Sequence, residues 1–335
     1  LGRAYERQML LSEARKKYER AASLAEELAK ESDTAAARRN VSISLGQLGS
    51  ICELERNYEK AIGYYERVLD ILKKEAEDHD TLEVKRDKAV NYSALARAYF
   101  GLRKVTESID YHKKSIAAYE EIHTAARTDL SEKDLLIAYR NTGRVLLRVS
   151  QPDNAIPHLE KALNIVRAQL AKEETVYSDR DLGEILGDLA EAYGMVDEFT
   201  RQTELLEELL MINKEIAEKS GSVEDNNRVA GIYSRLGYAA RSEGNLTKAV
   251  EHFTASLEIR EALSERSDET RLLDDLAHSH FDMGSILVSL GSKNARVFLA
   301  RAAEIVKILI ERCPEDRFYE RLIGSINMML MFLPE

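Results

Sequence analysis

Residues 236–257 read LGYAARSEGNLTKAVEHFTASL, and residues 48–69 read LGSICELERNYEKAIGYYERVL. Both stretches begin with Leu-Gly and end with Leu, and both carry an alanine and an aromatic residue at the same two internal places. The second stretch starts four steps of 47 residues before the first. This agreement predicts an internal repeat, which decides the fold of the whole chain.

The 47-residue step continues through the sequence in several columns. One column of small residues reads Gly2, Gly49, Ala96, Gly143, Ala190, Gly237 and Gly284. A second reads Ala14, Ala61, Ser108, Ala155, Gln202 and Ala249, and a third reads Tyr18, Tyr65, His112, Leu159, Leu206 and Phe253. The last unit is one residue short, so that Ala295 takes the place of Arg296 in the second column.

Within a unit the apolar spacing is helical. Ala61, Tyr65 and Leu69 follow one another at four-residue intervals, which places them on one face of a helix. Short breaks divide each unit into two helices, at residues 55–57, 150–152 and 243–245. We expect N-terminal caps at Ser131, Ser178 and Ser222, because each is followed three residues later by an aspartate. Small residues would let the paired helices approach closely.

These residues resemble the tetratricopeptide repeat. The resemblance rests on Leu236-Gly237 with Gly244, Leu246, Ala249, Phe253 and Leu257, and on Leu48-Gly49 with Tyr58, Ala61, Tyr65 and Leu69. The family's usual unit has 34 residues, so each unit here is 13 longer, as in extended repeats of bacterial signalling proteins, and the family's tryptophan is absent. The resemblance implies an all-α, right-handed superhelical solenoid of antiparallel helix hairpins.

The repeat predicts one continuous array rather than separate domains. We expect a partial unit at 1–30, six units at 34–78, 81–125, 128–173, 175–220, 222–267 and 269–313, and a C-terminal capping helix at 315–333. Leu1-Gly2 falls in the middle of a helix and no initiator Met is present, so we expect a fragment or a processed form. An uncapped N-terminal hairpin allows a homodimer as an alternative.

Composition excludes several classes of protein. Hydrophobic residues make up 44% of the 335 residues, which is too many for a disordered chain. The net charge is −11, which argues against nucleic acid as a partner. No apolar run is long enough to span a membrane. The two cysteines, Cys52 and Cys313, do not suggest a disulfide scaffold, so we expect a cytoplasmic protein. The resemblance to extended repeats of bacterial signalling proteins implies a bacterial source.

The sequence offers no convincing catalytic, cofactor or metal site. His278 and His280 lie two residues apart on a helix and point in different directions. Residues 77–80, Glu-Asp-His-Asp, would bind a cation weakly or form a solvated helix end. His112 falls in a core column and is expected to pack rather than act as a base. We therefore predict that the chain is not an enzyme and needs no cofactor.

A cluster of arginines is the strongest candidate site. The resemblance implies that the first helix of each unit lines a concave groove and contacts peptides. The predicted site residues on these helices are Arg97, Arg140, Asn141, Arg144 and Arg148. Guanidinium and amide groups of this kind bind carboxylates and peptide main chain. The alternative is an internally paired face, in which Asp188, Arg235 and Asp282 form an ion ladder and Glu191 neutralises Arg144.

These features predict a protein–protein interaction module that binds a peptide or protein segment, acidic in character, in the groove. One alternative is a sensor or regulatory array of a larger bacterial signalling or defence protein. Another is a receptor for a short signalling peptide. The arrangement lacks the Lys and Asn pattern of the family's carboxylate clamp, so a chaperone-tail receptor is not expected.

Overall fold

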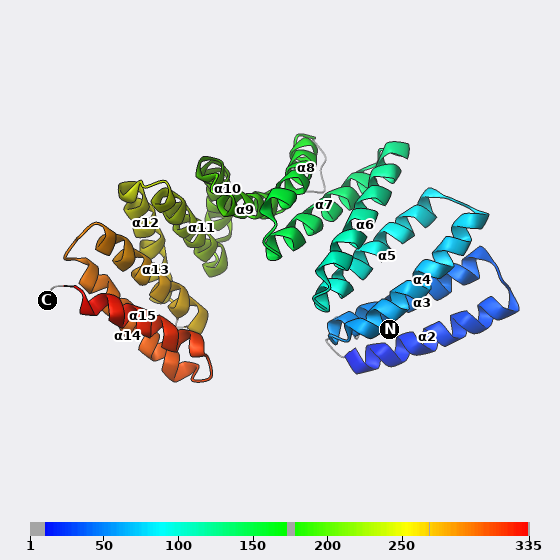
Figure 1. The fold of residues 1–335 in the computed structure, drawn as a ribbon, viewed down its shortest axis with the longest axis horizontal. Coiled ribbons are helices and arrows are strands. Elements are labelled where there is room, and N and C mark those ends of the chain that lie inside the picture. Colours follow the sequence, from blue (N-terminus) through cyan, green and yellow to red (C-terminus); the bar gives the residue numbers. More distant parts are fainter. Residues whose placement is uncertain (1–10, 173–177, 268, 334–335) are drawn as a thin grey trace. The chain divides into compact units, whose positions relative to one another are not determined.

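The computed structural model describes residues 11–172, 178–267 and 269–333, and these residues form α-helices and turns without a β-strand. The helices are labelled as in Figure 1. They are α2 (Leu11–Glu31), α3 (Ala35–Leu54), α4 (Tyr58–Asp78), α5 (Leu82–Gly101), α6 (Val105–Ala125), α7 (Asp129–Arg148), α8 (Pro152–Leu170), α9 (Asp179–Met195), α10 (Phe199–Ser220), α11 (Val223–Ser242), α12 (Leu246–Ser264), α13 (Thr270–Ser289), α14 (Ala295–Arg312) and α15 (Arg317–Met331).

The chain divides into two compact units, residues 1–169 and residues 170–335. Unit 1 contains α2 to α8 and unit 2 contains α9 to α15. Each is an array of antiparallel helix hairpins joined by short turns, with successive helices packed on one another (Figure 1). We call α3, α5, α7, α9, α11 and α13 the first helices, and their hairpin partners the second helices. The division into six sequence repeats stays a prediction.

Four hairpins are closed by contact between a glycine and a large residue. A Cβ atom added to Gly143 would lie 2.5 Å from Leu159, and one added to Gly237 would lie 2.6 Å from the Phe253 ring. In both hairpins the partner stands sixteen residues further along the chain. The missing side chain is therefore what allows the first and second helices to touch.

The last hairpin shows the same contact shifted by one residue. A Cβ atom on Gly284 would lie 2.6 Å from Leu299, which is fifteen residues away. Ala295, Leu299 and Ala302 are fully buried on the same face of α14. The structure thus confirms that the final unit is one residue short.

The turn inside each hairpin uses a left-handed residue at every 47th position. These residues are Arg56, Arg103, Ser150, Asp197, Gly244 and Gly291, with φ between 56° and 79°. A left-handed conformation reverses the chain and is favoured by glycine, yet glycine stands at only the last two of these places. Four hairpins therefore keep the turn with a side chain present, at some cost in strain.

The predicted caps are confirmed at two of three positions. Ser178 and Ser222 are N-caps, and each accepts a hydrogen bond from the main-chain N–H three residues on. The prediction at Ser131 is wrong by one turn, since Thr128 is the N-cap of α7. Ser131 closes the capping box from the third helical position, where its hydroxyl accepts from the Thr128 N–H at 3.0 Å. The threonine starts the helix earlier than the Ser-x-x-Asp pattern suggested.

Candidate functional site

The predicted site residues all lie on two first helices of unit 1. Arg97 belongs to α5, and the other four belong to α7. Four of the five, Arg97, Asn141, Arg144 and Arg148, line one open cavity of about 600 Å³, which we call the basic pocket. Its wall also includes Glu53, Phe100 and His112. Arg140 does not line this cavity.

Arg97 is held in the basic pocket by an acid from the neighbouring hairpin. Its Nε and Nη2 atoms donate to the two carboxylate oxygens of Glu53, at 3.3 and 3.0 Å. The Tyr65 hydroxyl donates to the same carboxylate at 2.5 Å. Burial, with the nearby Glu53 carboxylate, raises the pKa of Tyr65 above its ordinary value. Glu53 therefore orients the guanidinium, and the Arg97 side chain remains 52% exposed to solvent.

Arg148 lies at the other edge of the pocket. Its guanidinium carbon is 6.0 Å from the centre of the Phe100 ring, in a cation–π contact that leaves the residue exposed. Arg144 is also exposed, whereas Arg140 and Asn141 are half-buried. Both Arg140 and Arg144 have partners within the chain. The pocket wall thus presents three guanidinium groups and one carboxylate to a ligand.

His112 forms a buried part of the same wall. It is 3% exposed, and its Nε2 atom has no hydrogen-bond partner within the described ranges. Burial, reinforced by the charge of Arg97, lowers the pKa of His112 to about 4. Its burial confirms that His112 packs in the core column.

A second open cavity, of about 530 Å³, adjoins the basic pocket in unit 1. Ser50, Arg97 and Asn141 line both cavities. Its wall includes Ile43, Val90 and Ile137, one from each first helix of unit 1. We call this cavity the apolar pocket. It was not predicted from the sequence, although the three residues stand 47 apart in a single column.

Ion pairs join successive first helices at a fixed register. Arg39 lies 3.6 Å from Asp87, and Arg86 donates to both carboxylate oxygens of Asp134. In each case the acid stands 48 residues after the arginine, one more than the repeat. The same register appears in unit 2, where the Asn227 amide donates to Asp275 at 2.7 Å. These pairs join neighbouring hairpins within each unit, and Asp87 and Asp134 also line the apolar pocket.

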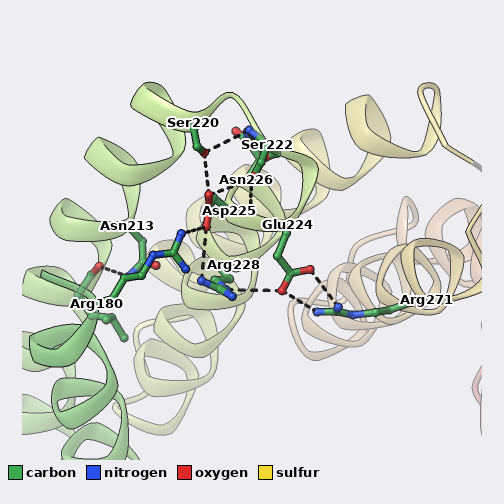
Figure 2. Close-up of polar contacts among 10 residues, drawn as sticks. Arg180, Asn213, Ser220, Ser222, Glu224, Asp225, Asn226, Arg228 and Arg271 are labelled. Atoms are coloured by element: carbon green, nitrogen blue, oxygen red, sulfur yellow. Dashed lines mark hydrogen bonds and ion pairs between the residues drawn. The ribbon is translucent and has the colours of Figure 1, made fainter. Parts of the chain in front are cut away.

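Unit 2 departs from this register at Arg180. Arg228 stands 48 residues later, where an acid would be expected, and Arg180 instead reaches Asp225 one turn earlier at 3.0 Å. Figure 2 shows Arg180 and Arg228 converging on this carboxylate, while Ser220 and Ser222 donate to its other oxygen. The serine hydrogen bonds lower the pKa of Asp225. Two guanidinium groups thus share one buried anion.

A cavity of about 520 Å³ in unit 2 is lined by Arg180, Arg228 and Arg235. Arg228 also lies 3.5 Å from Glu224, which pairs with Arg271 on the next first helix (Figure 2). Arg235 donates to the main-chain oxygen of Gly187 at 2.9 Å. All three arginines are therefore engaged within unit 2.

The ion ladder through Asp188, Arg235 and Asp282 stays a prediction. Burial lowers the pKa of Arg235, while the nearby charges of Glu191 and Asp188 act in the opposite direction. The Arg235 guanidinium also donates to the Gly187 carbonyl, and Asp282 accepts a hydrogen bond from the Tyr238 hydroxyl. Acids near the turn after α4 are paired as well, since Asp78 contacts Arg38 and Asp80 contacts Lys85.

The described residues contain no group of three or more His, Cys, Asp or Glu side chains placed to hold a metal ion. No helix among them is both long enough and apolar enough to cross a membrane.

Comparison with known families supports the repeat. Tetratricopeptide repeat models match residues 44–79, 92–123 and 230–263. A search of curated protein sequences finds no significant match. The model at 230–263 covers the whole of the stretch 236–257, in which the repeat is clearest.

Solved structures share the fold at low sequence identity. BtubC (BKLC) from P. vanneervenii is 15% identical with a TM-score of 0.56, over 76% of this chain and 92% of that one. The apo form of RapI is 15% identical with a TM-score of 0.55, over 93% and 79% of the two chains. PH0952 from Pyrococcus horikoshii, a Signal Transduction ATPase with Numerous Domains with a tetratricopeptide repeat sensor, is 12% identical with a TM-score of 0.60, over 96% and 46%.

These structures confirm the predicted all-α fold of stacked helix hairpins. Together with the periodic sequence and the three family matches, they show that the chain is a tetratricopeptide repeat protein.

Proposed function

We propose that the chain is a protein-interaction module whose unit 1 binds an acidic peptide or protein segment in the basic pocket. The observation that carries the proposal is the convergence of Arg97, Asn141, Arg144 and Arg148 on one cavity of about 600 Å³. Guanidinium groups recognise carboxylates through paired hydrogen bonds, and a side-chain amide can bind either polar group of a peptide bond.

The bonding of Arg97 supports this role. Glu53 already holds the guanidinium in the geometry that a carboxylate requires. A ligand carboxylate would therefore meet a side chain with little rotational freedom left to lose. Arg148 lies over the Phe100 ring, 6.0 Å from its centre. Two cations on neighbouring helices suit an acidic segment better than a single charge would.

A charge-reversal experiment tests the proposal. The probe is a fluorescein-labelled peptide of eight residues in which Glu and Ser alternate. We expect wild-type protein to bind it, and the Arg97→Glu/Arg148→Glu variant to bind it at least tenfold more weakly. The matched control is Arg20→Glu/Arg127→Glu, which changes the net charge equally at two exposed positions of unit 1 outside both pockets.

Circular dichroism of each variant checks that the helices are intact. If the two variants lose affinity equally, long-range charge rather than the pocket governs binding, and the proposal is wrong. If wild-type protein does not bind the peptide at all, the proposal also fails.

A second candidate function is a sensor array within a larger signalling protein. It is favoured by the fold similarity to PH0952, which is described as having a tetratricopeptide repeat sensor and of which this chain matches 46%. In that case the acidic ligand would change the activity of an effector domain in the same polypeptide. Assaying a longer natural chain with and without the peptide would distinguish a sensor from a simple binding module.

A further inference from the structure

Three aliphatic side chains form an exposed row across the groove of unit 1. Ile43, Val90 and Ile137 are 47%, 48% and 44% exposed. They stand at equivalent positions of α3, α5 and α7, and all three line the apolar pocket. β-branched residues are weaker helix formers than alanine or leucine, so half-exposed helical positions do not require them for the fold.

The row is confined to unit 1. The same column of the sequence continues in unit 2 as Glu184, Gly231 and His278. An apolar row that is repeated in three consecutive hairpins and absent from the next three is a property of one groove, not of the repeat. Covering these side chains with apolar ligand groups would remove them from water.

Side-chain amides lie one turn further along the same helices. Gln47 follows Ile43 by four residues, Asn141 follows Ile137 by four residues, and both line the apolar pocket. The two amides are half-buried, and neither forms a hydrogen bond in the part of the chain that the structure describes. Each offers a donor and an acceptor to a ligand.

The arginines form a third row beyond the amides. Arg97 follows Val90 by seven residues, and Arg148 follows Ile137 by eleven residues. At a rise of 1.5 Å per residue these arginines lie about 10 Å and about 16 Å along their helices from the aliphatic row. Along their length the first helices of unit 1 therefore carry, in a fixed order, three aliphatic residues, two amides on α3 and α7, and arginines on α5 and α7.

This order fits an extended ligand better than a helical one. Successive side chains of an extended chain point to opposite sides, so one edge can be apolar while the other is acidic. Its main-chain N–H and C=O groups need partners, and the amide row lies where that main chain would run. A helix satisfies its own main chain and would leave the amides without a role.

We propose that the groove of unit 1 selects an extended segment in which apolar and acidic residues alternate. Apolar side chains contact Ile43, Val90 and Ile137, the main chain hydrogen-bonds to Gln47 and Asn141, and acidic side chains reach Arg97 and Arg148. This proposal rests on the proposed function, because it assigns the acidic edge of the ligand to the basic pocket. The occupant is a segment of another protein.

Three labelled eight-residue peptides test the proposal. In the first, Leu and Glu alternate; the second has the same composition in two blocks of four; the third is the alternating Ser and Glu peptide. We expect wild-type protein to bind the first at least tenfold more tightly than either of the others. Far-UV circular dichroism of the complex should show no gain of helix over the separate components.

Variants of the aliphatic row separate this proposal from the proposed function. Ile43→Ser/Val90→Ser/Ile137→Ser should abolish the advantage of the Leu–Glu peptide and leave the Ser–Glu affinity unchanged. The control is Leu24→Ser/Leu28→Ser/Leu130→Ser, three exposed apolar residues of unit 1 outside both pockets, which should change neither affinity.

The outcomes distinguish the two failures. If the Ser–Glu peptide binds through Arg97 and Arg148 but the Leu–Glu peptide binds no better, the apolar row is not a recognition surface and only this proposal is overturned. Equal affinity for the alternating and block peptides, or a gain of helix on binding, would overturn the extended geometry. If wild-type protein binds none of the three peptides, the proposed function is overturned as well.

Discussion

Arg97 and Glu53 form a two-point hydrogen-bonded pair between neighbouring hairpins of unit 1, at 3.3 and 3.0 Å. The pair lies on the wall of the basic pocket, where Glu53 both orients the arginine and competes with any acidic ligand for it. An ion pair can in this way hold a binding group ready and also limit its affinity.

Replacing Glu53 by Gln should strengthen binding of the Ser–Glu peptide by about fivefold, since an exposed ion pair is worth about 1 kcal/mol. The glutamine keeps an acceptor for Tyr65, so the loss of stability should be small. Fluorescence anisotropy measures the affinity. Glu59→Gln, at an exposed position of α4, removes the same charge outside the pocket and should leave affinity near wild type. Weaker binding by Glu53→Gln would show that orientation outweighs competition.

Gly237→Ala should destabilise unit 2 by about 1–3 kcal/mol, as overpacking of a close contact does. The added methyl group would lie 2.6 Å from the Phe253 ring, which is 1% exposed and cannot move away freely. Gly63→Ala, in the middle of α4 with open space around its Cα, should instead stabilise by about 0.5–1 kcal/mol. Urea unfolding of both variants checks the prediction. Equal effects would mean that the close helix contact is not the source of the glycine requirement.

Ser150→Gly should stabilise unit 1 by up to about 1 kcal/mol, because Ser150 has φ of 56° in the turn between α7 and α8. The reverse change, Gly244→Ala, places a side chain at φ of 79° in the equivalent turn of unit 2 and should cost about 1 kcal/mol. Denaturant midpoints give both values. A loss of stability in Ser150→Gly would indicate that the serine side chain, not the turn conformation, decides that position.

His112 should make unit 1 less stable in mild acid. Its folded-state pKa of about 4 lies below the unfolded value of about 6.5, so the unfolded chain binds the proton first. Stability is therefore full above about pH 6.5 and falls between pH 6.5 and 4, by up to a few kcal/mol. His112→Leu, which copies Leu159 and Leu206 in the same column, should flatten this dependence. Urea unfolding at pH 4.5 and pH 7 measures this dependence. If the variant loses as much stability between the two pH values as the wild type does, the acid sensitivity belongs to other groups, such as His280.

The helical hairpins could be predicted because the repeat places small and large residues at regular intervals, and Gly143 and Leu159 meet as that spacing requires. The aliphatic row of Ile43, Val90 and Ile137 could not be predicted in this way. Ile43 and Leu45 are both aliphatic in the sequence, and only the packing of α3 shows that Ile43 is 47% exposed while Leu45 is 1% exposed. Apolar character alone does not say which side of a helix faces a groove.

Of the five predicted site residues, four line the basic pocket and Arg140 does not. Arg140 precedes Asn141 by one residue, which turns it about 100° around α7. The hydrogen bond from Arg235 to the Gly187 carbonyl and the cap of α7 were also beyond the sequence, since a main-chain carbonyl and a threonine one turn earlier compete with the expected groups. Local alternatives of this kind differ by small free energies that a periodic pattern does not express.

The most direct test of the central claim is a titration of arginine-labelled protein with the Ser–Glu peptide, followed by NMR of the side-chain Nε–H groups. Binding in the basic pocket predicts that the resonances of Arg97 and Arg148 shift in a saturable manner, while those of Arg20 and Arg127 stay in place. Saturable shifts confined to Arg180 and Arg228 in unit 2, or no saturable shift at any arginine, would contradict it.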